Sequence, residues 1–132
     1  MVQEFLEKLC AELSIDTVPK LNEDNIFRFA PDIHVAITDL GPGVGMQSVI
    51  SGCPISKRED LFIYLMKANL LGQGTGNARI GLDRNDKNLT LSRGLPYEIN
   101  YQIFKEAFEE FVNHLIYWRN AIAKFENEKP MY

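Results

Sequence analysis

The sequence has little of what disulfide-rich, membrane-spanning or nucleic-acid-binding proteins need. Its 132 residues include two cysteines, Cys10 and Cys53, so at most one disulfide could form, and Cys10 falls in a helical pattern typical of a small buried thiol. No apolar run approaches the roughly 18 residues of a membrane-spanning helix. The 14 basic residues are outnumbered by 18 acidic ones, and the net charge of -4 argues against nucleic acid or an anionic membrane surface as the main partner.

Signals for export and for a second domain are missing as well. The first residues, Met1 to Glu4, contain neither the positive charge nor the apolar stretch of a secretory signal peptide. The length fits one domain, and 45% hydrophobic with 24% charged residues is typical of a globular protein. We therefore expect a single domain over residues 1–132, without membrane insertion, located in the cytoplasm.

No pattern for catalysis or cofactor binding is visible. Glycines cluster at 41–45 and 72–76, but neither cluster lies between a predicted strand and a helix N-terminus, where a phosphate would bind. The two histidines, His34 and His114, have no cysteine or carboxylate at metal-ligand spacing. The sequence thus predicts no catalytic residue, no metal site and no cofactor.

Apolar spacing predicts an α+β domain. Helical periodicity covers residues 2–14, 57–71 and 100–125, and the four residues Ser56 to Glu59 have the pattern of a capping box. The connections between the first three strands are too short for parallel crossovers, which favours an antiparallel sheet. The predicted order is α-β-β-β-α-β-β-α, with five strands at 26–30, 33–39, 44–50, 78–83 and 88–92.

The last helix has the clearest pattern. Its apolar residues recur at alternating spacings of four and three, and further apolar residues widen the stripe, which suits a helix lying on a sheet better than a coiled coil. The stripe consists of Phe104, Phe108, Phe111, Leu115, Trp118, Ile122 and Phe125, widened by Ile103, Ala107, Val112 and Ile116.

The second helix is apolar on nearly every side, which is more than one sheet contact can bury. Either the last helix folds over the remainder, or the helix meets its copy in a homodimer. We favour the dimer. Its expected interface residues are Leu61, Phe62, Tyr64, Leu65 and Met66.

Three segments give the chain a resemblance to the class I type III secretion chaperones of the Tir-chaperone (CesT-like) family. They are the opening helix at 5–13, the passage from Ala68 to Asp83 with its glycine loop, and the closing aromatic helix. The resemblance covers nearly the whole chain. Gly41, Gly43 and Gly45 depart from it, because they leave the third strand less apolar than expected.

This resemblance implies a twisted antiparallel sheet with three helices and a homodimer built largely on the second helix. It also implies a bacterial cytoplasmic protein that binds the N-terminal segment of an exported effector, keeps it extended and delivers it to the export apparatus or its ATPase. Such chaperones do not hydrolyse ATP.

An extended client could add to a sheet edge through main-chain hydrogen bonds while its side chains enter apolar pockets. The alternative for each apolar residue near the first two strands is that it simply builds the core. The expected client-binding residues are Phe5, Leu9, Phe27, Phe29, Ile33, Val35 and Ile37.

Two other interpretations remain open at the level of sequence. One is an α+β interaction or regulatory domain unrelated to secretion, which binds an acidic or helical partner through residues 100–125. The other, less favoured, is an enzyme or ligand-binding domain with a pocket between the sheet and the last helix.

Overall fold

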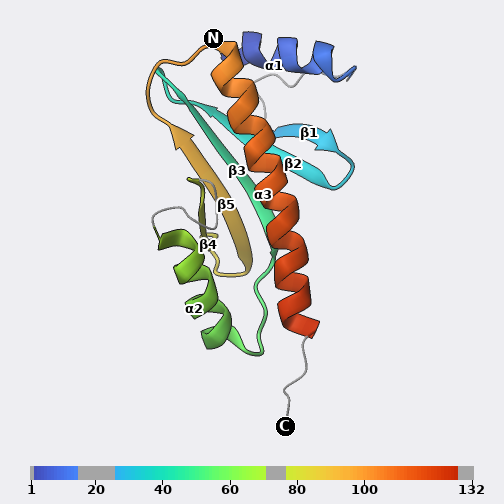
Figure 1. Cartoon of the computed structure of the whole chain (residues 1–132), viewed down its shortest axis with the longest axis vertical. Helices are drawn as coiled ribbons and strands as arrows, with labels where there is room; N and C mark the ends of the chain where they lie inside the picture. Colours follow the sequence, from blue (N-terminus) through green and yellow to red (C-terminus); the bar gives the residue numbers. More distant parts are fainter. Residues whose placement is uncertain (1, 15–25, 71–76, 128–132) are drawn as a thin grey trace.

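A computed structural model describes residues 2–14, 26–70 and 77–127, apart from the side chains of Phe29 and Asn127. Within these ranges the element order is the predicted one (Figure 1). The helices are α1 (Val2–Glu12), α2 (Arg58–Asn69) and α3 (Tyr101–Asn127), and the strands are β1 (Ile26–Ala30), β2 (Ile33–Asp39), β3 (Val44–Gly52), β4 (Arg79–Leu82) and β5 (Asn88–Leu95). None of these helices is long and apolar enough to cross a bilayer.

The five strands form one antiparallel sheet in the order β1-β2-β3-β5-β4. Helix α3 runs diagonally over the sheet, α1 lies across the first turns of α3, and α2 stands beside β4 (Figure 1). In the β4–β5 hairpin Ile80 pairs with Leu91 and Leu82 with Leu89.

Among the described residues, the alternation of burial along β2 and β3 marks one face of the sheet as the core side. Along β2, Ile33, Val35 and Ile37 are buried while His34 and Thr38 are exposed, and β3 alternates in the same way. This alternation is typical of an antiparallel sheet that packs on one side and meets water on the other.

Helix α3 covers the buried face with its aromatic stripe. Asn100 begins the helix by accepting a hydrogen bond from the Ile103 N–H at 2.9 Å, as an N-cap residue does. Phe104 stacks on Phe5 of α1 with ring centroids 5.4 Å apart, and Phe108 meets Phe27 of β1 edge-on at 5.4 Å. Phe104, Phe108, Phe111, Leu115, Trp118 and Ile122 are buried, and Phe125 is half-buried.

Two local expectations were wrong. Ser56 does not cap α2: Lys57 is the residue before the helix, in a left-handed conformation and without a side-chain capping hydrogen bond. Ile103 and Ile116 are 39% and 43% exposed, so they do not widen the buried stripe. Despite the glycines near its start, β3 extends from Val44 to Gly52, two residues beyond the predicted end at 50.

Gly43 is instead required where β3 begins. Its φ of +97° is in the left-handed region, and a Cβ there would lie 2.0 Å from the main-chain oxygen of Leu95. Because no L-residue with a side chain fits that space, glycine lets the β3 backbone approach the end of β5.

Arg119 of α3 holds together the end of β3. The ladder between β3 and β5 shifts register between Val49 and Ser51, which leaves main-chain carbonyls without their regular partners. The Arg119 guanidinium donates to the oxygens of Ile50 at 3.1 Å and Val49 at 3.0 Å, and also to that of Asp32 in the β1–β2 turn. One side chain thus ties helix, bulge and turn together.

We expect Arg119→Ala to lower the free energy of unfolding by about 2 kcal/mol, since hydrogen bonds to a charged group are worth more than neutral ones. Arg119→Lys should recover only part of this, because an ammonium cannot reach three carbonyls in a planar fork. Urea denaturation measures the difference. Arg84→Ala, in the exposed β4–β5 turn, is the control, and an equal stability of the two alanine variants would contradict the assignment.

Candidate protein-binding surfaces

The residues expected to bind a client lie together, where α1 and the β1–β2 hairpin pack against α3. In the single chain six of the seven are buried, none more than 7% exposed, and the side chain of Phe29 lies outside the described residues. Their role in client binding stays a prediction. The six buried residues are Phe5, Leu9, Phe27, Ile33, Val35 and Ile37.

This apolar layer reaches the surface at Leu13. Leu13 continues the spacing of Phe5 and Leu9 along α1 by one more turn, and its N–H donates to the Leu9 oxygen at 3.0 Å. Unlike the two preceding residues it is 41% exposed. The sequence contains this signal, since Leu13 is the third apolar residue at a spacing of four in the opening helix.

Helix α2 divides the expected dimer residues between its two sides. Leu61 and Leu65 are buried within their own chain and Phe62 is half-buried, whereas Tyr64 and Met66 are 37% and 71% exposed. A dimer contact is not tested by the structure of one chain. The division shows that only part of the expected set can face a second copy in this conformation.

Sequence reasoning missed the outward stripe of α2. Ile63 and Leu70 are 54% and 63% exposed and share a helix face with Met66. Ile55, just before the helix, is 94% exposed. Spacings of three and four residues from Ile63 to Met66 and Leu70 could have identified this stripe.

An aromatic groove of about 710 Å³ lies between α2 and α3. Tyr64 of α2 contacts Trp118 and Phe125 of α3, with ring centroids 5.6 and 6.0 Å apart. Lys67 and His114 contribute polar groups to the groove wall. The groove lining thus combines aromatic with polar side chains, as protein-binding surfaces do.

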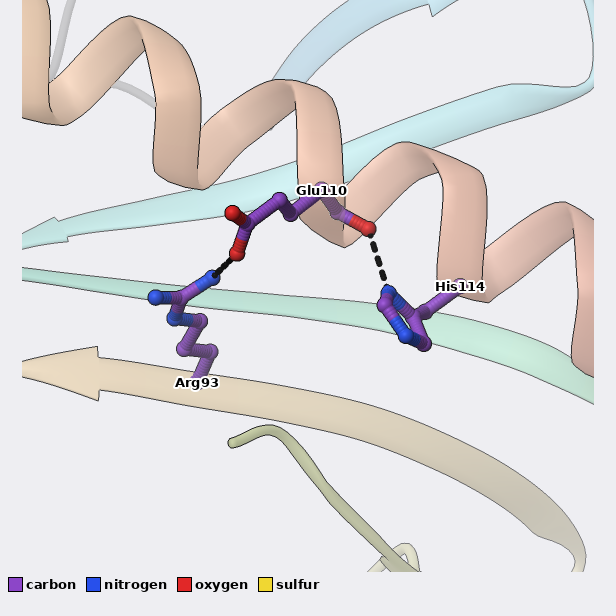
Figure 2. Close-up of polar contacts among 3 residues, drawn as sticks. All are labelled: Arg93, Glu110 and His114. Atoms are coloured by element: carbon purple, nitrogen blue, oxygen red, sulfur yellow. Dashed lines mark hydrogen bonds and ion pairs between the residues drawn. The ribbon is translucent and has the colours of Figure 1, made fainter. Parts of the chain in front are cut away.

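His114, which lines this groove, belongs to a short series of polar contacts around Glu110 of α3 (Figure 2). Arg93 of β5 forms an ion pair with Glu110 at 2.9 Å, and the Arg93 side chain is 12% exposed. The main-chain oxygen of Glu110 lies 2.8 Å from Nδ1 of His114, one turn further along the helix. The ion pair links α3 to β5, whereas the His114 contact lies within α3.

A shallow cleft of about 410 Å³ lies beside the bulge of β3. Ile26, Ala36 and Val49 supply apolar surface, and Asp32 and Arg119 are polar lining residues. Ser48 bridges β3 to β2 nearby, where its hydroxyl donates to the His34 oxygen at 2.7 Å. Within the described residues, no three histidine, cysteine, aspartate or glutamate side chains gather in a way that could hold a metal ion.

An ion pair fixes the end of α1 to α3. Lys105 Nζ lies 2.9 Å from a carboxylate oxygen of Glu12, and this hydrogen bond lowers the pKa of the Glu12 carboxyl and raises that of the Lys105 ammonium. Burial raises the pKa of the Cys10 thiol on the inner side of the same helix.

The Glu12 pair should stabilise the fold in a pH-dependent way. Because the folded state lowers the pKa of Glu12, its contribution is present above the ordinary value of 4.5 and is lost as the pH falls through the lowered value. Glu12→Gln should therefore lose stability at neutral pH and approach the wild type in acid. Urea denaturation at several pH values measures this, with Glu7→Gln as control, and a gap that stays constant with pH would count against the pair.

Comparison with known proteins places this geometry in a family. The family model for the Tir chaperone protein (CesT) family matches residues 4–119. Seven chains of solved structures match, among them one in the crystal structure of the ExsC–ExsE complex, with a TM-score of 0.70 and 13% identity over 90% of this chain and 91% of that chain. Comparison with curated proteins gives no match.

The match over most of the chain confirms the resemblance inferred from the three sequence segments, and it favours secretion over the unrelated interaction domain. Members of this family act by binding other proteins rather than by catalysis. The chain belongs to the Tir chaperone protein (CesT) family of type III secretion chaperones.

Proposed function

We propose that this protein is a dimeric cytoplasmic chaperone that binds the N-terminal segment of an exported effector in a bacterium. It keeps that segment extended and delivers it to the export apparatus, without catalysis or a cofactor. The family match over residues 4–119 carries this proposal. The structural neighbour comes from a complex of ExsC with ExsE, which supports a second protein as the ligand of this fold.

The proposed dimer forms through the outward stripe of α2. Ile63, Met66 and Leu70 expose more than half of their surface in the single chain. Exposed apolar side chains that lie together are typical of a protein-binding site. Burial of each such side chain contributes roughly 1.5–3 kcal/mol. In a twofold contact both copies bury the same residues, so each residue of the stripe contributes twice.

Met66→Glu should yield a folded monomer, because the side chain projects into water in the single chain and a buried charge would oppose dimer formation. Ile103→Glu places the same charge on a 39% exposed residue of α3 and should leave the dimer intact. Sedimentation velocity measures the mass and circular dichroism the fold. If Met66→Glu and Ile103→Glu have the same mass, the dimer contact lies elsewhere.

The proposed client site is the layer between α1 and the β1–β2 hairpin. Its sequence-predicted residues are apolar and adjacent, and β1 forms one end of the sheet, where an extended segment can add by main-chain hydrogen bonds. In the single chain Leu13 is the exposed end of this layer. The client therefore meets Leu13 first, and contact with the deeper residues requires α1 to shift.

Affinity purification from the native cells tests both function and site. An exported protein should be retained, and deletion of its N-terminal segment should abolish binding. Leu13→Asp should weaken the complex at least tenfold (~1.4 kcal/mol) while circular dichroism stays unchanged, since an apolar contact becomes charged.

Ala11→Asp, on an exposed position of the same helix, is the matched control and should bind as the wild type does. Retention of a partner through its folded C-terminal part would contradict the proposed function. Equal binding by the Leu13 and Ala11 variants would contradict only the site.

A further inference from the structure

The outer edge of β4 is occupied by a side chain that imitates a neighbouring strand. Strand β4 ends the sheet on the side of α2, and Asn69 is the last residue of α2 (Figure 1). Asn69 Nδ2 donates to the main-chain oxygen of Ile80 at 2.8 Å, and Asn69 Oδ1 accepts from the Ile80 N–H at 2.8 Å. Both main-chain groups of one strand residue are therefore paired with one amide.

These hydrogen bonds lie on the edge that faces away from β5. The Asp83 N–H donates to the main-chain oxygen of Asn88, so Asp83 directs its N–H toward β5. Main-chain groups alternate in direction along a strand, so Ile80, three residues earlier, directs its N–H and C=O outward. The Asn69 amide fills the place of a sixth strand at this point.

The chemistry of the contact is that of a peptide group. A carboxamide offers one N–H donor and one oxygen acceptor on the same carbon, and two strands exchange the same two bonds at each hydrogen-bonded pair. A second acceptor on this edge is also occupied: Arg79 Nη1 donates at 2.9 Å to the oxygen of Ala78, two residues before Ile80.

Unprotected sheet edges attract strands of other chains, and a short edge strand with its polar groups covered resists such pairing. We propose that Asn69 closes the edge of β4 to strand addition by a second copy of this chain. Copies then cannot pair edge to edge at β4, and association is confined to other surfaces. This inference does not depend on the client or on the α2 dimer.

Asn69→Ala tests the inference through exchange of the Ile80 amide and through the mass of the protein. In dilute solution the Ile80 amide should exchange with solvent roughly fivefold faster than in the wild type, the factor that corresponds to the loss of a hydrogen bond worth about 1 kcal/mol. As concentration rises, that exchange should slow again and sedimentation should show species larger than the wild type, because the open edge pairs with another copy.

A second substitution shows whether the association uses β4. By the same alternation Leu82 directs its N–H outward, so Leu82→Pro removes an edge donor without breaking the ladder to β5. Added to Asn69→Ala, it should restore the wild-type mass. Asn85→Ala, in the exposed hairpin turn, is the control for loss of an asparagine side chain.

Fast Ile80 exchange at every concentration, with a wild-type mass, would show that Asn69 only anchors α2 and would overturn the inference. Association that persists with Leu82→Pro would overturn it too. If Asn69→Ala does not fold, Asn69→Asp serves instead: it keeps the acceptor for the Ile80 N–H and loses the donor to the Ile80 oxygen. If the Asn69→Asp variant then has the wild-type mass at all concentrations, this result would count against edge closure.

Discussion

The packing of one long helix onto one face of one sheet is the constraint on which this molecule depends. The stripe of α3 supplies five of the twelve largest fully buried side chains among the described residues, and strands and α1 contribute partners such as Phe27 and Phe5. A single apolar layer of this kind buries the face of the sheet that α3 covers. Arg93 and Arg119 then fix the helix to β5 and to the bulge of β3 through polar contacts.

This arrangement leaves apolar surface exposed that other proteins can bind. Helix α2 buries Leu61 and Leu65 and presents Ile63 and Met66 outward, with Leu70 directly after it, so apolar surface remains exposed there. Family membership, an aromatic groove beside α2 and the exposed end of the α1 layer all agree with a protein that works by binding. The sheet that makes this possible also has an edge to protect, and Asn69 covers that edge.

Several parts of the fold could be predicted because they depend on local patterns. The spacing from Phe104 to Ile122 identifies a buried helical face, and the alternation around the 83–87 turn pairs Ile80 with Leu91. The capping box failed because Lys57 adopts a left-handed conformation that places the helix start one residue later than the Ser56 pattern requires. For the proposed client site, the sequence pattern could not separate a residue that faces the core from one that faces a partner.

The order of elements and the antiparallel sheet could be inferred from the sequence, because periodicity and turn residues act over a few neighbouring positions, and the family was inferred from a resemblance in three segments. Which apolar residues are exposed depends on how the elements pack together. Leu61 and Met66 are both apolar and lie on the same helix, yet Leu61 is fully buried and Met66 is 71% exposed. The hydrogen bonds between Asn69 and Ile80 could not be predicted from the sequence either, because they depend on which edge of the sheet α2 reaches.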